Sequence, residues 1–267
     1  MSFIVMLFLL IRKKLNNISI AIPTYNSSKY LSVLLENLSL INNVGEIVIN
    51  DDNSSQSEIE KLKMIVEKNN KKHNIKIFFN NENFGGFKNK YIAVGKCTSD
   101  FVYQIDSDNI PNIKLLKKII NRFDLENFKN SLFLPSSINP FRFNHMSESK
   151  RRNKIVFSKK NMILNKNNIQ SILENDSNVK YLLGLGNPIF HRLTYLDYLS
   201  EGLHIYKDIE AACSVALCYY WLKNEGNLHL LKDLHHFHRR HDDSYYLKKQ
   251  KNSEKMAEDF FIKISQL

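Results

Sequence analysis

Short apolar runs alternate with helical patterns over the first half of the chain. The runs at 18–23, 46–50, 74–80 and 100–106 are rich in Ile, Val and Phe, which is typical of buried strands. Between them, apolar residues recur at helical spacing, as in the segment "SSKYLSVLLENLSLI" behind its serine caps. This alternation predicts an α/β fold with a Rossmann-like, mostly parallel sheet and helices on both faces.

The alternation loosens after residue 130. Two further strands are predicted at 131–136 and 153–158, and a last one at 227–233. A strong helical pattern covers 208–226 and is closed by Gly226. The second half therefore continues the α/β pattern with less regular spacing.

No internal repeat and no Pro/Gly/Ser-rich linker interrupts the chain. We therefore predict one domain over 18–245 with two halves, 18–125 and 126–245, followed by a charged helix over 246–267. Within the first half, "PNIKLLKKIINRF" predicts a helix with its proline near the first turn.

Residues 1–17 form an apolar segment with a basic end, "RKK". The apolar part is too short to span a bilayer, which needs roughly 20 apolar residues. Its basic residues follow the apolar part, whereas in a signal peptide they precede it, and no small-residue cleavage site appears. It is interpreted as an interfacial anchor, as a start-site extension, or as a short helix packed on the domain.

The composition indicates the cellular compartment and the class of ligand. The three cysteines, Cys97, Cys213 and Cys218, are odd in number and lack metal-ligand spacing, which favours a reducing cytoplasm, with peripheral contact at the inner face of the plasma membrane as an option. A formal net charge of +11 raises affinity for anions such as nucleic acid, anionic lipid or phosphorylated small molecules.

Polar residues follow three of the predicted strands. The first ends in "PTYN", the second in "NDDNS" and the fourth in "DSDN", while "NNENFGGFKNK" follows the third. Because ligands of open α/β sheets bind beyond the carboxyl ends of the strands, these residues are expected at one binding edge. Clustered carboxylates there are explained by a divalent cation, Mg²⁺ or Mn²⁺, that joins them to a diphosphate.

Each of these acids also has a structural interpretation. Asp108 or Asn109 could cap the helix that follows. Asp51 and Asp52 could stabilise a turn after a strand, and Lys88 could be a solvated lysine. Four such motifs, one after each of the first four predicted strands, favour a binding site over these structural roles.

The set "ISIAIPTYNSSKYL", "EIVINDDNSS", "NENFGGFKNK" and "FVYQIDSDN" resembles the family-2 glycosyltransferases of the GT-A fold, from Ile18 to Asn112. A weaker similarity extends from Gly184 to Ser244. The resemblance implies a sugar transfer from a nucleoside-diphosphate sugar, with a UDP-sugar preferred, and Mn²⁺ or Mg²⁺ as cofactor. It also implies a nucleotide-sugar half (18–125) and an acceptor half (126–245).

The resemblance assigns roles by position. Pro23, Thr24 and Tyr25 resemble residues that hold the base and ribose, and Asp52 resembles the acid that hydrogen-bonds the base. Lys88, which replaces a common arginine, is expected to reach the diphosphate. The two acids of the D-x-D motif come last: Asp106 would lie near the ribose or sugar, and Asp108 would bind the metal.

In the family, an acidic pair that opens a late helix supplies the general base. Here Asp208 matches the second acid, while Lys207 replaces the first. Asp208 is the expected base, because a helix N-terminus favours its ionised form. It could equally be a helix cap, and Glu210 is the second candidate.

The run "HHFHRRHDD" is expected to complete the metal site. Alternation along a strand would place His236 and His238 on one face. His238 is the first choice as a metal ligand by the resemblance and His241 the next, whereas an exposed basic segment is the alternative. Gly184 and Gly186 could admit a sugar close to the backbone or form a plain bend.

The competing hypotheses are a nucleotidyltransferase and a basic nucleic-acid-binding protein. The first would carry a Gly-rich, basic loop after the first strand, but "PTYNSSKY" has neither glycine nor arginine. The second lacks a recognition motif. The expected partners are therefore a nucleotide-sugar donor and a glycan or lipid-linked acceptor, in surface polysaccharide or lipid-linked glycan synthesis, without nucleic acid.

Overall fold

The computed structural model describes residues 18–41, 44–70, 74–114, 116, 128–141, 155–156, 160–176, 178–239, 241 and 248–267. The apolar segment 1–17 and the residues 142–154 lie outside these ranges. No helix in the described part of the chain is both long and apolar enough to cross a membrane.

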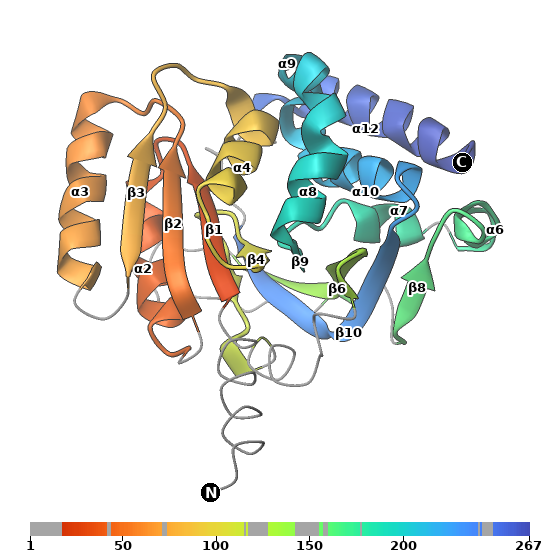
Figure 1. Ribbon diagram of the computed structural model, residues 1–267, viewed down its shortest axis with the longest axis horizontal. Helices are drawn as coiled ribbons and strands as arrows, with labels where there is room; N and C mark the ends of the chain where they lie inside the picture. The colour runs from red at the N-terminus through yellow and green to blue at the C-terminus, as the bar shows by residue number, and fades with distance from the viewer. Residues whose placement is uncertain are drawn as a thin grey trace, which may run out of the picture.

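The described strands form a mixed sheet with two unlike halves (Figure 1). The first half is parallel throughout, as the alternation predicted. In the second half β9 runs antiparallel to both β4 and β6, while β6 and β10 are parallel. The order along the sheet is β3 (Ile75–Phe79), β2 (Val44–Asp51), β1 (Ile18–Thr24), β4 (Phe101–Gln104), β9 (Ile189–His191), β6 (Ser131–Phe141), β10 (Asn227–Arg239) and β5 (Ile110–Pro111), with β7 (Ile155–Val156) on β6 and β8 (Met162–Leu164) on β10.

Successive residues of the parallel strands enter two different cores, one on each face of the sheet. Ile20 and Ile22 pack with α2 (Ser28–Leu38) and α3 (Gln56–Asn70), whereas Ala21 between them packs with α4 (Gly85–Gly95). All three side chains are fully buried. The predicted strand–helix alternation is thus confirmed, because side chains alternate across a strand and both faces need a helix.

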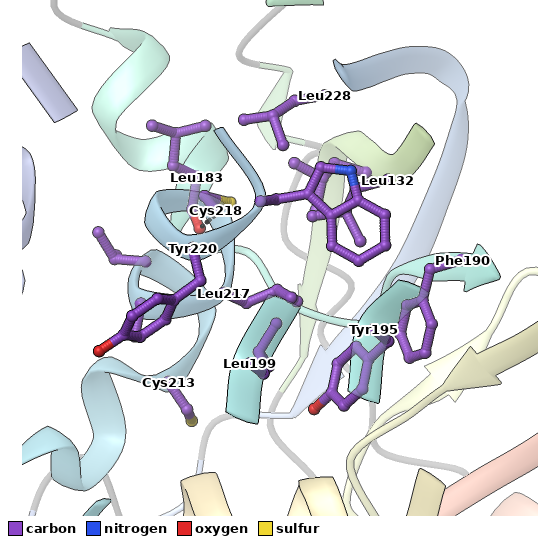
Figure 2. Close-up of a cluster of buried hydrophobic side chains, with 14 of the residues drawn as sticks. Leu132, Leu183, Phe190, Tyr195, Leu199, Cys213, Leu217, Cys218, Tyr220 and Leu228 are labelled. Carbon is purple, nitrogen blue, oxygen red and sulfur yellow. Dashed lines mark hydrogen bonds between the residues drawn. The ribbon is translucent and has the colours of Figure 1, made fainter. Parts of the chain in front are cut away.

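Helices cover the second half of the sheet as one apolar cluster (Figure 2). Phe190 of β9 stacks on Tyr195 with ring centroids 4.3 Å apart, and the Cys218 thiol donates a hydrogen bond to the carbonyl of Leu183. The contributing helices are α6 (Ile169–Asn175), α7 (Asn178–Leu183), α8 (Arg192–Leu199), α10 (Cys213–Lys223) and α12 (Gln250–Ser265). This cluster fixes the segment that joins α8 to α10.

Two sequence predictions are wrong in this half. The helical pattern at 208–226 does not start at residue 208: η2 (Ser200–Ile205), α9 (Tyr206–Ile209) and η3 (Glu210–Ala212) precede α10, which begins at Cys213. The last strand does not end at 233, because β10 continues to Arg239 along β6. The helix predicted after Pro111 is present at 113–114 and 116, and Pro111 itself lies just before it in β5, which pairs with β10.

Candidate active site

The polar residues after β1 and β4 meet at the carboxyl edge of the parallel strands. The chain passes from β1 to β2 on one side, while β4 lies on the other side of β1, and ligands bind at such a reversal of strand order. The hydroxyl of Ser27 lies 2.6 Å from that of Thr24 and 2.8 Å from that of Ser107. These hydroxyls therefore connect "PTYN" to "DSDN".

Pro23, Thr24 and Tyr25 differ in their access to solvent. Pro23 and Thr24 are buried in β1, whereas 48% of Tyr25 is exposed. Asn26 turns the chain at φ 47° and its amide donates to the Ser54 hydroxyl at 2.7 Å. Tyr25 thus presents an open aromatic ring beside the reversal of strand order.

Asp52 anchors the start of α4. Its Oδ1 accepts hydrogen bonds from the Asn80 side chain at 2.8 Å and the Phe84 amide at 3.0 Å, and its Oδ2 accepts from the Gly85 amide at 2.7 Å. Burial raises the pKa of Asp52, although these hydrogen bonds oppose the rise. A carboxylate has about four acceptor positions, so one remains for a ligand N–H.

Asp51 stabilises the turn after β2. It accepts from both the amide and the hydroxyl of Ser54, at 2.8 and 2.6 Å. It is fully buried, and burial raises its pKa. The turn interpretation of the acidic pair therefore describes the contacts of Asp51, whereas Asp52 binds the start of α4.

The two lysines of α4 have different surroundings. Lys88 lies over two rings, with its Nζ 3.6 Å from the centroid of Phe84 and 4.5 Å from that of Tyr206. Lys90 pairs with Asp106 instead, with Nζ 2.8 Å from Oδ1. Burial alone would lower the pKa of Lys90, but the Asp106 carboxylate outweighs it and raises that pKa. Lys90 is therefore a fixed cation in the site.

Asp106 lies at the end of β4 and is held from two sides. Burial would raise its pKa, but the charge of Lys90 lowers it, so Asp106 stays ionised. Its amide donates to Asn187 Oδ1 at 2.9 Å. The Nδ2 of Asn187 is buried without a partner among the described residues, and the adjacent Gly186 has φ 67°. A Cβ at Gly186 would lie 3.0 Å from Ser214 Oγ and 3.8 Å from Asp106 Oδ2.

Asp108 contacts a histidine that follows β10. Its Oδ2 lies 2.9 Å from His241 Nε2, and its carbonyl accepts from Arg239 Nε at 2.9 Å. Tyr30 of α2 supports both partners, with its ring centroid 4.8 Å from the His241 ring and 4.5 Å from the Arg239 guanidinium. Asp108 is not a helix cap, because β5 intervenes before the next helical residues.

His236 and His238 lie on β10 with ring centroids 5.8 Å apart, as strand alternation predicted. Both interact electrostatically with Asp106. Burial and the neighbouring His238 lower the pKa of His236 to about 3, so it is neutral at physiological pH. Its Nε2 is buried without a hydrogen-bond partner among the described residues.

Two side chains offer donor atoms for a divalent ion that would take its other ligands from a substrate. The described residues contain no group of three or more His, Cys, Asp or Glu that could hold a metal ion by itself. Asp108 Oδ2 and His241 Nε2 do converge within 2.9 Å of each other. Mg²⁺ and Mn²⁺ accept carboxylate and imidazole ligands, and Mg²⁺ commonly takes further oxygens from phosphates.

Asp208 and Glu210 occupy different environments on the segment before α10. Asp208 lies inside α9 and is exposed, so the expected position at the start of the long helix is wrong. Glu210 has φ 50°, and its Oε1 lies 3.4 Å from Lys249 Nζ. Its Oε2 is buried without a hydrogen-bond partner in the described chain. Asp208 is thus accessible, whereas Glu210 is enclosed.

Lys90 is a residue of this site that the sequence motifs did not predict, although it lies two positions after Lys88. The sequence does indicate a buried position for Lys90, because it falls at helical spacing between Phe87 and the buried residues Ala93 and Val94. A lysine on an apolar helix face requires a buried partner. Asn187 gave no such signal, because its contact with Asp106 spans 81 residues of chain.

The chain is similar to several glycosyltransferases. Over 103 residues the chain is 35% identical to the poly(ribitol-phosphate) beta-N-acetylglucosaminyltransferase TarS of Staphylococcus aureus, covering 37% of this chain and 17% of that protein. A further 115-residue alignment is 34% identical to an uncharacterized glycosyltransferase of Haemophilus influenzae, covering 41% of this chain and 43% of that one. These matches span less than half of either relative.

Solved structures of S. aureus TarS share the fold. Residues 1–349 of TarS in complex with UDP-GlcNAc superpose with a TM-score of 0.64 at 20% identity, over 92% of this chain and 66% of that one. The complex with UDP gives a TM-score of 0.61 at 21% identity, over 92% and 65%. The predicted GT-A architecture is thereby confirmed.

The family profile described as glycosyl transferase family 2 matches residues 19–175, which include all four motifs at the strand ends. This range is more than half of the chain. The chain therefore belongs to glycosyl transferase family 2 and is a glycosyltransferase of the GT-A fold.

Proposed function

We propose that this protein is a metal-dependent, inverting glycosyltransferase that moves a sugar from a UDP-sugar to a hydroxyl of a glycan or lipid-linked acceptor. The observation that carries the proposal is the turn at the end of β4, where Asp106 pairs with Lys90 and Asp108 with His241. The TarS structures with UDP-GlcNAc and UDP support a uridine nucleotide as the donor.

The donor would lie across the ends of β1, β2 and β4. The exposed ring of Tyr25 is suited to stack on the base, and the remaining acceptor position of Asp52 is suited to a base N–H. Thr24 would contact the ribose. Lys88 would leave the rings of Phe84 and Tyr206 to reach the diphosphate.

Asp108 would hold Mn²⁺ or Mg²⁺ together with His241, since these two side chains already converge. His238, which the sequence favoured as the metal ligand, becomes the second candidate because it interacts with Asp106. When bound, the ion would supply Lewis-acid stabilisation of the departing diphosphate. Lys90 keeps Asp106 ionised, and Asp106 would orient the ribose or the sugar.

Asp208 would act as the general base. The acceptor oxygen forms a bond to the anomeric carbon, while the bond between that carbon and the β-phosphate oxygen breaks and its electron pair leaves with UDP. The proton of the acceptor hydroxyl passes to the Asp208 carboxylate. Exposure favours Asp208 over Glu210 for this role, because a base must reach the acceptor and Glu210 is enclosed beside Lys249.

The variant Asp208→Asn tests this proposal. Transfer should fall by about 10²–10⁴-fold, the usual contribution of general-base catalysis. Binding of UDP with Mn²⁺, measured by calorimetry, should persist because the base contacts the acceptor. NMR of the product should show the opposite anomeric configuration to the donor.

Glu210→Gln is the comparison, and it should reduce transfer less than Asp208→Asn. A retained configuration, or a nearly normal rate in Asp208→Asn, would contradict the assignment. Calorimetry of the wild-type protein without added nucleotide gives the baseline. Absence of metal-dependent UDP binding would contradict the donor class.

A further inference from the structure

The segment that carries Asp208 bends sharply one residue after α9. Glu210 has φ 50° and ψ −125°, a backbone conformation that residues with a Cβ rarely adopt. We refer to residues 209–211 as the elbow. Such strain persists only where the surrounding structure holds it, and it concentrates at functional sites.

The contacts that hold the elbow come from α12, far along the chain. The amide of Ala211 donates to Ser253 Oγ at 3.2 Å, and Lys249 Nζ lies 3.4 Å from Glu210 Oε1. Ser253 is 1% exposed although it is polar and lies on a helix. A buried hydroxyl inside a helix is usually unfavourable, so this contact requires an explanation.

α12 has an anchor of its own. Phe260 packs against Tyr219 and Tyr220 of α10, with ring centroids 5.4 and 6.1 Å away, and both Phe260 and Ile264 are fully buried. These apolar contacts fix α12 on α10 independently of Ser253. Ser253 can therefore serve as a fixed point for the elbow.

We propose that Ser253 is a positioning residue for glycosyl transfer: by holding the Ala211 amide, it fixes the elbow and so aims Asp208 at the acceptor. Lys249 supports it through Glu210. This inference rests on the proposed role of Asp208 as base. It adds that α12 is part of the acceptor-side machinery, because it acts through the elbow.

The variant Ser253→Ala tests the inference. Alanine favours helix and removes only the acceptor atom, so α12 should stay folded. The kcat for transfer should fall between about 10- and 100-fold, the usual effect of a displaced catalytic group. The KM for the donor should not change. Ser265→Ala, an exposed serine on the same helix, should leave the kcat unchanged, and Ser253→Thr should restore part of it.

The double variant Ser253→Ala/Asp208→Asn separates positioning from general stability. If Ser253 acts through Asp208, the double variant should be no slower than Asp208→Asn alone. Multiplied losses would overturn the inference, because they mean that Ser253 acts elsewhere. An unchanged kcat in Ser253→Ala would also overturn it while leaving the base assignment intact.

Lys249→Met provides a second route if Ser253→Ala does not fold. Lys249 is nearly half exposed, so its loss leaves packing intact. The kcat of Lys249→Met should fall without a change in the KM for the donor. Lys251 is an exposed lysine nearby, and Lys251→Met should behave as wild type. A normal kcat in Lys249→Met would contradict the role of the contact between Lys249 and Glu210 in holding the elbow. A nearly normal Asp208→Asn would instead overturn the proposed base and the inference with it.

Discussion

Carboxylates occur at both edges of the parallel strands, and they are surrounded differently. At the amino edge, Glu46 of β2 is 2% exposed and accepts four hydrogen bonds: from Ser19 at 2.8 Å, from Lys76 at 2.7 Å, and from the amide and the hydroxyl of Thr98 at 2.5 and 2.7 Å. At the carboxyl edge, Asp106 pairs with Lys90 but its side chain remains 33% exposed. The arrowheads of β2 and β3 in Figure 1 point toward this second edge.

This difference in surroundings distinguishes an acid whose hydrogen bonds stabilise the fold from acids that are available to a ligand. Every contact of Glu46 is made within the protein, so the carboxylate has little capacity left for a ligand. At the carboxyl edge, Asn187 Nδ2 and His236 Nε2 lack partners among the described residues. Unsatisfied buried polar groups are costly, and their presence beside the partly exposed Asp106 and Asp108 is consistent with a site for an incoming polar ligand.

Asp108→Ala should have the largest effect, because it removes the expected metal ligand. Transfer should fall by roughly 10³-fold, as several kcal/mol of charge stabilisation are lost. Mn²⁺-dependent binding of UDP, measured by calorimetry, should disappear while the thermal unfolding temperature changes little. Asp100→Ala is the matched control, because Asp100 is an exposed acid just before the amino end of β4. Normal activity of Asp108→Ala would remove the central claim.

Lys90→Met should have the next largest effect, because it leaves Asp106 without its cation. Burial then dominates and raises the pKa of Asp106, whereas Lys90 now lowers it. The acid limb of the pH profile for donor kcat/KM should therefore move to higher pH, with a loss of about 10²-fold at neutral pH. Lys96→Met, an exposed lysine just after the same helix, is the control. An unmoved acid limb would mean that Asp106 does not act in the ionised form.

Glu46→Gln should lower stability rather than activity. Burial would raise the pKa of Glu46, but hydrogen bonds from Lys76 and Thr98 lower it from 4.5 to about 2. Because the folded-state pKa is the lower one, the carboxylate stabilises the fold above pH 4.5, and this stability is lost as the pH falls toward 2.

The free energy of unfolding of Glu46→Gln at pH 7, measured by urea denaturation, should be lower by about 2 kcal/mol. The difference from wild type should shrink as the pH falls below 4.5. Glu60→Gln, an exposed acid on α3, should unfold as wild type. A large loss of transfer without a loss of stability would contradict the structural role of this edge.

The sequence by itself determined the parallel half of the fold and the location of its acids. Strands such as 18–23 and helices such as α3 follow from local apolar periodicity, and both are confirmed. The position of Asp106 and Asp108 after β4 then follows, because parallel strands direct their carboxyl ends to one edge.

The tertiary structure decided which side chains meet at that edge. Asp108 and His241 are 133 residues apart, and Asp106 and Asn187 are 81 apart. Local periodicity carries no information on such pairs. The expected helix start at Asp208 failed for the same reason: the sequence pattern is helical throughout, but contacts of Glu210 with α12 impose a bend that local propensity alone would not produce.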